Sequence, residues 1–204
     1  RVVTASELIE SLLRDRLLHE TTGGGVTVSG GEPALQPDFT AELIGELRRL
    51  GVHTAVETAG NVPWPDLKQA VAEADLILFD FKHAEPAVHA GWTGAPNEVI
   101  VANLRRLSAE AAASGQQLVV RIPLIPGANS DLAVLAGMAE VLAGLPHLDG
   151  VELLPYHNLG VPKYGALRRE YAMPEVSSPT SEELRVAAGI FREAGLEVKL
   201  ESEG

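Results

Sequence analysis

The 204 residues are enough for one domain with a sizeable core, and 46% hydrophobic with 22% charged residues is ordinary for a globular protein. A formal net charge of −12 excludes a generic nucleic-acid or anionic-membrane surface, because both require clustered Lys and Arg side chains. The sequence contains no cysteine, which excludes disulfides and Cys-ligated metals within it. No apolar run reaches the ~18 residues of a membrane span and no signal segment opens the sequence, so the cytoplasm is the expected compartment.

Short β-branched runs alternate with longer helical patterns, and this alternation predicts βα units around a parallel sheet. Asp38 is the predicted N-cap of the second helix, and Gly51 its end. The predicted strands are residues 26–28, 53–56, 76–79, 118–120 and 151–154, with a short sixth at 197–200. The predicted helices cover about residues 5–18, 39–50, 65–74, 97–114, 131–143 and 181–194. Because no linker or repeat divides these elements, we expect a single domain over residues 1–204.

Polar residues stand where each predicted strand ends. In parallel α/β barrels the loops at the carboxyl ends of the strands converge on one face and carry the reacting groups. A turn or a helix cap explains any one of these residues taken alone, but five groups together predict a functional face. The groups are residues 29–32, Glu57 with Thr58, Asp80 with Lys82, Arg121, and His157.

Two of these groups suit a zwitterionic ligand. Gly30 and Gly31 let a ligand approach the backbone, and the Glu32 carboxylate accepts from an ammonium group, although a Gly-Gly turn with a solvated Glu is commoner. Asp80 and Lys82 are two residues apart on a strand, so both side chains lie on one side of it. An internal ion pair between them is the structural alternative. Lys82 also suits a Schiff-base aldolase, but the adjacent carboxylate favours a protonated amine.

Arg121 precedes an apolar segment with prolines, residues 122–129. This segment forms either a dry wall for a flat purine or a loop buried against the next helix. His157 lies between Tyr156 and Asn158, where its ring can donate to or stack on a ligand. The other histidines have no metal-ligand spacing and are treated as background: His19, His53, His83, His89 and His147.

In order and spacing, six segments of the chain resemble the radical S-adenosylmethionine activating enzymes of glycyl radical enzymes, the pyruvate formate-lyase activating enzyme type. These segments are residues 22–33, 57–60, 80–83, 92–97, 121–129 and 153–164. The resemblance implies an open, partial parallel βα barrel of the radical SAM type. It has about five main strands, and the family's first strand and cysteine loop are missing.

By this resemblance, residues 30–32 receive the methionine amino group of S-adenosylmethionine, and residues 80–82 hold its carboxylate end. Arg121 and His157 flank the carboxylate, the sulfonium and the nucleoside. Some family members also hold a monovalent cation between Glu57 and the acid of the 80–82 segment. Ten residues stand at the family's cofactor-binding positions: Gly30, Gly31, Glu32, Glu57, Thr58, Asp80, Phe81, Lys82, Arg121 and His157.

The family's reaction cleaves S-adenosylmethionine reductively at a 4Fe-4S cluster. The resulting 5′-deoxyadenosyl radical removes hydrogen from a glycine of a partner glycyl radical enzyme, and flavodoxin or ferredoxin supplies the electron. Because the cluster cysteines are absent, we expect this chain alone to be inactive, either as a fragment of a longer activase or as a degenerate homologue. Many such activases carry a ferredoxin-like insertion in the missing region. Two other classes stay open: a non-catalytic barrel that binds a ligand or partner, and a Schiff-base aldolase using Lys82.

Overall fold

The computed structural model describes residues 2–157 and 176–200, which fall into two compact units. The first unit contains residues 1–80, 98–119 and 146–149, and the second contains residues 81–97, 120–145 and 150–204. The expected single domain over residues 1–204 stays a prediction. Of the segment 153–164 that carries the family resemblance, residues 158–164 lie outside the described residues.

In the first unit, strands alternate with helices as the sequence predicts. The strands are β1 (Gly25–Val28), β2 (His53–Thr58) and β3 (Leu76–Asp80). The helices are α1 (Ala5–Leu12), α2 (Arg16–Thr22), α3 (Pro37–Arg49), α4 (Trp64–Val71) and α6 (Glu98–Ser114), with 3₁₀ turns η1 (Leu13–Asp15) and η2 (Pro33–Leu35). Parallel pairing joins β1 to β2 and β2 to β3.

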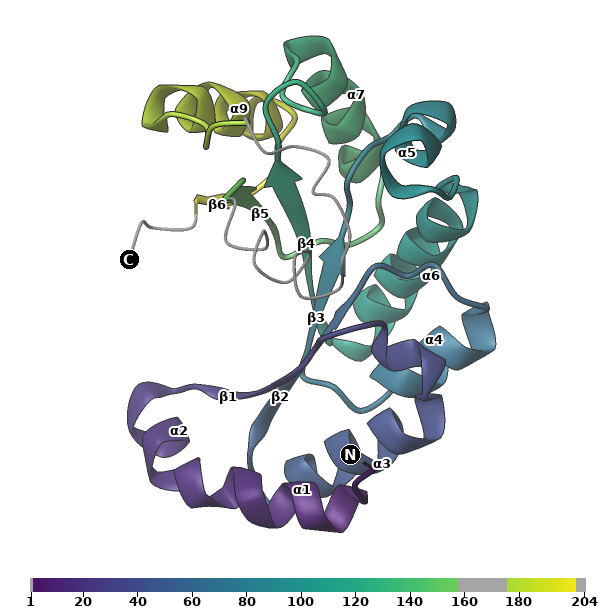
Figure 1. Ribbon diagram of the computed structural model, residues 1–204, viewed down its shortest axis with the longest axis vertical. Coiled ribbons are helices and arrows are strands. Elements are labelled where there is room, and N and C mark those ends of the chain that lie inside the picture. The colour runs from purple at the N-terminus through teal and green to yellow at the C-terminus, as the bar shows by residue number, and fades with distance from the viewer. Residues whose placement is uncertain (1, 158–175, 201–204) are drawn as a thin grey trace. The chain divides into compact units, whose positions relative to one another are not determined.

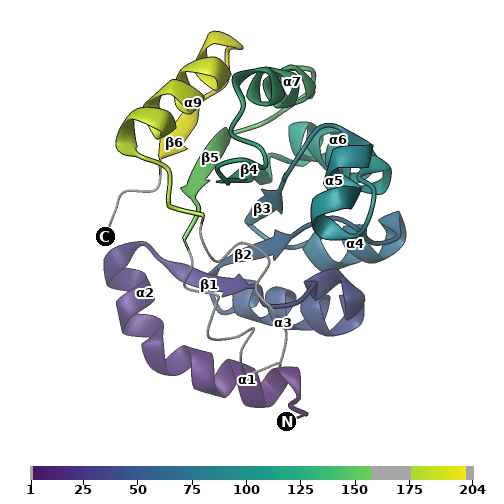
Figure 2. The same cartoon turned by 45° about the horizontal axis from the view of Figure 1, so that its top comes forward.

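In the second unit, α7 (Leu132–Ala143) and α9 (Ser181–Glu193) lie side by side, as Figures 1 and 2 show. The unit also contains α5 (Pro86–Thr93), β5 (Gly150–Pro155) and β6 (Val198–Leu200), and β5 pairs with β6 in parallel. Strand β4 (Gln117–Leu124) begins in the first unit and ends in the second. The strand order is β1-β2-β3-β4-β5-β6, which confirms the predicted open α/β sheet with a short sixth strand.

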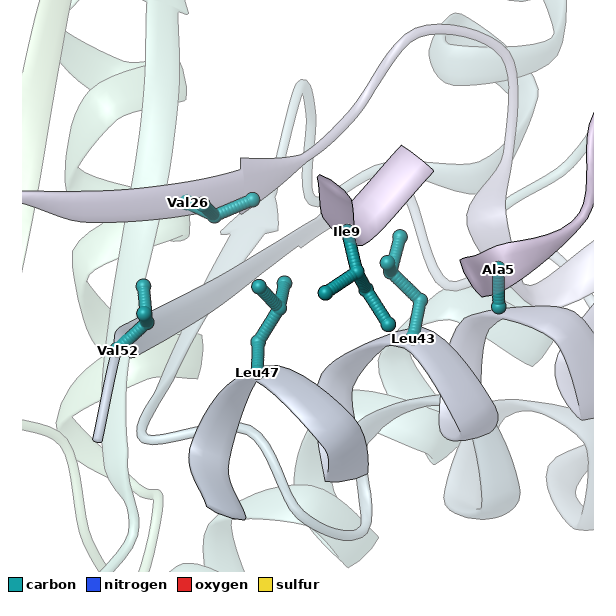
Figure 3. Close-up of a cluster of buried hydrophobic side chains, with 6 residues drawn as sticks. All are labelled: Ala5, Ile9, Val26, Leu43, Leu47 and Val52. Atoms are coloured by element: carbon teal, nitrogen blue, oxygen red, sulfur yellow. The ribbon is translucent and has the colours of Figure 1, made fainter. Parts of the chain in front are cut away.

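The core of the first unit forms where α1 and α3 cover one face of β1. A capping box between Thr4 and Glu7 begins α1, and Ala5 and Ile9, one turn apart, are buried where α1 packs against α3. Figure 3 shows Ile9 pointing toward Leu43, which lies one turn from Leu47 on α3, while the short Ala5 side chain points toward α3 itself. Val26 and Val52 complete the cluster. This packing anchors α1 and α3 against β1, and β1 leads into the Gly30–Glu32 turn.

The predicted helix over residues 5–18 is wrong as one continuous helix. The chain forms α1, η1 and α2 in succession, and Leu12 and Leu13 at the junction pack partly buried against the core. A 3₁₀ turn winds more tightly than an α-helix, so it changes which face of the chain meets the sheet. The predicted N-cap at Asp38 is also wrong. Pro37 takes the first helical position, which suits its fixed φ and missing N–H, and Gln36 is the cap.

Helix α5 lies between residues 79 and 97, where the sequence analysis predicts neither a strand nor a helix. It begins at Pro86 and ends before Gly94, which has φ 83° and donates its N–H to the Ala90 carbonyl. Proline at the first position and a left-handed glycine after the last are the ordinary signs of a helix. Pro86 and Gly94 were therefore the sequence signal for α5.

Strand β4 is longer than the predicted strand over residues 118–120. Leu118, Val120, Ile122 and Leu124 are all buried, so the alternation continues through Pro123. The prediction placed Arg121 at the end of this strand, and that placement is wrong, because Arg121 lies within it. Part of the predicted apolar wall, residues 122–124, is therefore strand, and the loop begins at Ile125.

Candidate functional site

Two carboxylates share one face of the first unit's sheet at the carboxyl ends of neighbouring strands. Glu57 of β2 stands opposite Leu78 of β3, and Asp80 is two residues further along β3. Because side chains alternate along a strand, Glu57, Leu78 and Asp80 point to the same side. Both carboxyl-bearing residues are half-buried. This face therefore carries two acidic side chains, and carboxylates are groups that receive an ammonium group or a small cation.

The predicted Gly30–Glu32 turn follows β1, and it reaches across to the end of β2. Gly30 has φ 101°, a conformation that glycine adopts without strain. The Glu32 carboxylate accepts from the Thr58 hydroxyl at 2.7 Å, from the Ala59 N–H at 3.0 Å and from the Ala34 N–H at 3.2 Å. The structure thus brings Glu32 and Thr58 together, as two members of the predicted site.

An asparagine of α6 that the sequence interpretation missed binds the loop after β2. Asn103 of α6 is buried, and its amide donates to the Gly60 carbonyl at 2.8 Å and to the Val62 carbonyl at 2.9 Å. Gly60 itself has φ 67° and donates its N–H to Thr58 Oγ1 at 2.9 Å. A polar residue within the apolar stripe of a helix was the signal for this role, because buried amides need partners.

In the second unit, Lys82 lines a cavity of about 190 Å³ whose wall is mostly apolar. Phe81, the residue before it, is fully buried and donates its N–H to the Arg121 carbonyl at 2.8 Å. The buried side chain of Asn129 donates to the Lys82 carbonyl at 3.0 Å and accepts from the Ile125 N–H at 2.8 Å. The cavity is lined by Lys82, His83, His89, Trp92, Thr93, Ile125, Ala128 and Asn129.

Two histidines that the sequence interpretation treated as background lie in this cavity wall, and each is only 5% exposed. Burial lowers the pKa of His83, and the neighbouring His89 lowers it further, while Glu85 opposes the shift. His83 Nδ1 accepts from the Glu85 N–H at 2.9 Å, so the proton of the neutral ring is on Nε2. His89 Nδ1 lies 2.7 Å from the Ala95 carbonyl and must donate to it. Burial in the cavity wall, not metal-ligand spacing, distinguishes these histidines.

The remaining predicted residues lie on β4 and after β5. Arg121 Nε donates to the Glu152 carboxylate at 2.7 Å, and both side chains are about three-quarters buried. Its guanidinium thus has a protein partner on the neighbouring strand. His157 follows β5 and is exposed. The prediction that these strand-end groups form one functional face stays a prediction.

Across residues 2–157 and 176–200, no group of three or more His, Asp and Glu side chains is arranged to hold a metal ion. The monovalent cation between Glu57 and Asp80 is not tested by that result and stays a prediction. Within the same residues, none of the helices has the length and apolar character needed to cross a bilayer.

The open parallel α/β sheet agrees with the partial barrel that the sequence resemblance implies, and comparisons with known proteins point to the same family. The radical SAM superfamily model matches residues 1–135. The isethionate sulfite-lyase activating enzyme of Nitratidesulfovibrio vulgaris is 42% identical over 193 residues, which cover 94% of this chain and 61% of that protein. The pyruvate formate-lyase-activating enzyme of Staphylococcus aureus is 35% identical over 92% of this chain and 75% of its own length.

A solved structure gives the same result. The crystal structure of a domain of pyruvate-formate lyase-activating enzyme from Bacteroides vulgatus shares 30% identity, with a TM-score of 0.71 over 88% of this chain and 99% of that one. The chain belongs to the radical SAM superfamily, among the activating enzymes of glycyl radical enzymes. It spans 54% to 61% of the length of several curated relatives that it matches.

The family implies S-adenosylmethionine and a 4Fe-4S cluster, and the residues of this chain fit the two differently. The acidic pair on one sheet face suits the ammonium group of the cofactor, and an apolar cavity beside a lysine suits a carboxylate-bearing organic ligand. The cluster needs thiolate ligands, and none of the 204 residues is a cysteine. We therefore derive no step through the cluster from these residues.

Proposed function

We propose that this chain is the cofactor-binding portion of a glycyl radical enzyme activating enzyme. In the whole protein, a cluster held outside these residues would supply the electron that cleaves S-adenosylmethionine. The 5′-deoxyadenosyl radical would then abstract hydrogen from a glycine of a partner enzyme, with flavodoxin or ferredoxin as the electron donor. On this proposal the chain alone is inactive, because it has no cysteine.

The observation that carries the proposal is the placement of Glu57 and Asp80 on one sheet face at adjacent strand ends. Two carboxylates attract a cation, such as the α-ammonium group of the methionine moiety of S-adenosylmethionine. The carboxylate of the same methionine moiety needs a second, basic partner. Lys82, two residues beyond Asp80 in sequence, is the candidate for that partner. The relatives are themselves named as activating enzymes of this class, which supports the assignment.

The test uses the whole protein that contains this chain, with its cluster reduced and a candidate glycyl radical enzyme present. We expect release of 5′-deoxyadenosine together with the electron paramagnetic resonance signal of a glycyl radical on the partner. Omission of the partner should remove the second signal. Binding of S-adenosylmethionine without 5′-deoxyadenosine would instead favour the non-catalytic barrel. Covalent trapping of a carbonyl compound on Lys82 by borohydride would favour the aldolase.

A further inference from the structure

The Glu32 carboxylate is already engaged by three donors of the protein itself. Two are backbone N–H groups, of Ala34 and Ala59, and one is the Thr58 hydroxyl. The two oxygens of a carboxylate offer about four acceptor sites, so at most one stays available to a ligand. A side chain engaged in this way differs from the direct ammonium ligand that the sequence interpretation assigned.

These contacts join two strand ends that are far apart in sequence. Glu32 belongs to the turn after β1, whereas Thr58 and Ala59 belong to the end of β2 and the loop after it. Oxygen Oε1 accepts from Thr58 and Ala34, and Oε2 accepts from Ala59, so the carboxylate spans the gap between the two segments. Hydrogen bonds to an ionised acceptor are roughly twice as strong as neutral ones.

The contacts continue beyond Thr58. Its Oγ1 accepts from the Gly60 N–H at 2.9 Å while its hydroxyl proton goes to Glu32, and Thr58 is buried. Asn103 then binds the Gly60 carbonyl from α6. The residue immediately before Thr58 is Glu57, whose side chain points to the opposite face of the strand. Whatever fixes Thr58 and Ala59 therefore also fixes the backbone that presents Glu57.

We propose that Glu32 is a positioning residue: its carboxylate ties the turn after β1 to the loop after β2 through Thr58 and Ala59, and so sets the position of Glu57. The importance of that position for the cofactor rests on the proposed function. The tie itself does not, and it can be measured in the protein without ligand.

The first arm follows the Ala59 and Gly60 amides by NMR and hydrogen exchange in the ligand-free chain. Glu32→Gln and Thr58→Val should each shift both amides and speed their exchange, because one removes the charged acceptor and the other the hydroxyl. Thr58→Ser keeps the hydroxyl and should retain the native signals. Unchanged Ala59 and Gly60 amides in Glu32→Gln would overturn the proposal.

The second arm measures the affinity for S-adenosylmethionine in the same variants. Glu32→Gln and Thr58→Val should each weaken binding about tenfold, the effect of one lost charge-assisted contact, and the double variant should be no weaker than the worse single one. Thr58→Ser keeps the hydroxyl that donates to Glu32 and should weaken binding less than Thr58→Val does. If Glu32→Gln weakens binding while Thr58→Val does not, Glu32 is a direct ligand and the proposal is wrong.

Glu7→Gln is the matched control, since the Glu7 carboxylate accepts from the Thr4 N–H and hydroxyl in the capping box of α1. It should alter neither the Ala59 amide nor the affinity. If the native chain binds no S-adenosylmethionine, the proposed function loses its support, whereas the amide measurements still decide whether Glu32 ties the two segments.

Discussion

His83 is the residue whose ionisation the fold opposes most clearly. Burial lowers its pKa from the ordinary value of 6.5, so the native state favours the neutral ring and the unfolded chain binds a proton more readily. This contribution to the free energy of unfolding is fully present above pH 6.5, and it is lost as the pH falls from there through the native pKa. We expect His83→Asn, which keeps an acceptor near the Glu85 N–H, to flatten the fall in stability below neutral pH.

The measurement is denaturant unfolding of both proteins at a series of pH values. His53→Asn is the matched control, because His53 is exposed at the start of β2. If the free energy of unfolding falls equally with pH in the native protein and in His83→Asn, the lowered pKa of His83 is contradicted.

Lys82 allows a separation of binding from folding. On the proposed function its ammonium contacts the cofactor carboxylate, a charge-assisted contact worth ~1.5–3 kcal/mol, or roughly ten- to a hundredfold in affinity. Lys82→Ala should therefore weaken binding with a small change in melting temperature, whereas Lys68→Ala, which removes an exposed ion pair with Glu110, should change neither much. A large fall in melting temperature with unchanged affinity would show that Lys82 is one half of a buried ion pair.

Gly60 combines a backbone and a packing requirement. Its φ is 67°, and an added Cβ would lie 2.4 Å from the ring of Phe79, a fully buried side chain with little room to move. We expect Gly60→Ala to cost about 2–5 kcal/mol in the free energy of unfolding. At Gly94, with φ 83° and no heavy atom within 4 Å of an added Cβ, the same change should cost only about 1–2 kcal/mol. Chemical denaturation measures both variants. If Gly60→Ala and Gly94→Ala lose the same free energy of unfolding, the Phe79 ring moves aside to accommodate the added Cβ.

At the scale of elements, the sequence predicts strands better than helix ends. The β-branched runs that became β2, β3 and β5 were recognised, since buried parallel strands are continuous apolar runs. The extension of β4 through Pro123 was not, because proline argues against a strand unless its missing N–H is tolerated there. The break at η1 depends on how Leu12 and Leu13 pack, and helical periodicity alone does not contain that information.

Strand β1 is terminal in the strand order, with β2 as its neighbour. Terminal strands expose backbone groups that pair with other chains, so we predict that this protein self-associates as its concentration rises. A lysine on such a strand discourages pairing, and Thr27→Lys, at an exposed position of β1, should reduce the association. Thr21→Lys on α2 adds the same charge elsewhere in the unit and should not. A concentration-independent monomer in light scattering would count against this prediction.

At the scale of the whole molecule, the sequence placed the site residues at strand ends but not their contacts. The sequence motifs correctly placed four site residues at the ends of β1 to β3: Glu32, Glu57, Thr58 and Asp80. The pairing of Arg121 with Glu152 depends on which strands are neighbours, and sequence spacing does not encode it. Asn103 and Asn129 were missed for the same reason, since their partners are backbone carbonyls of distant loops.

The central claim is that the strand ends of this chain bind S-adenosylmethionine, and chemical-shift mapping of the ¹⁵N-labelled protein tests it most directly. Titration with the cofactor should move a saturable set of amides at residues 30–32, 57–60 and 80–82, near Arg121 and near His157. Amides of α1 and of the Lys68–Glu110 surface should stay in place. Saturable shifts confined to residues away from these strand ends, or no shifts at all, would contradict the account.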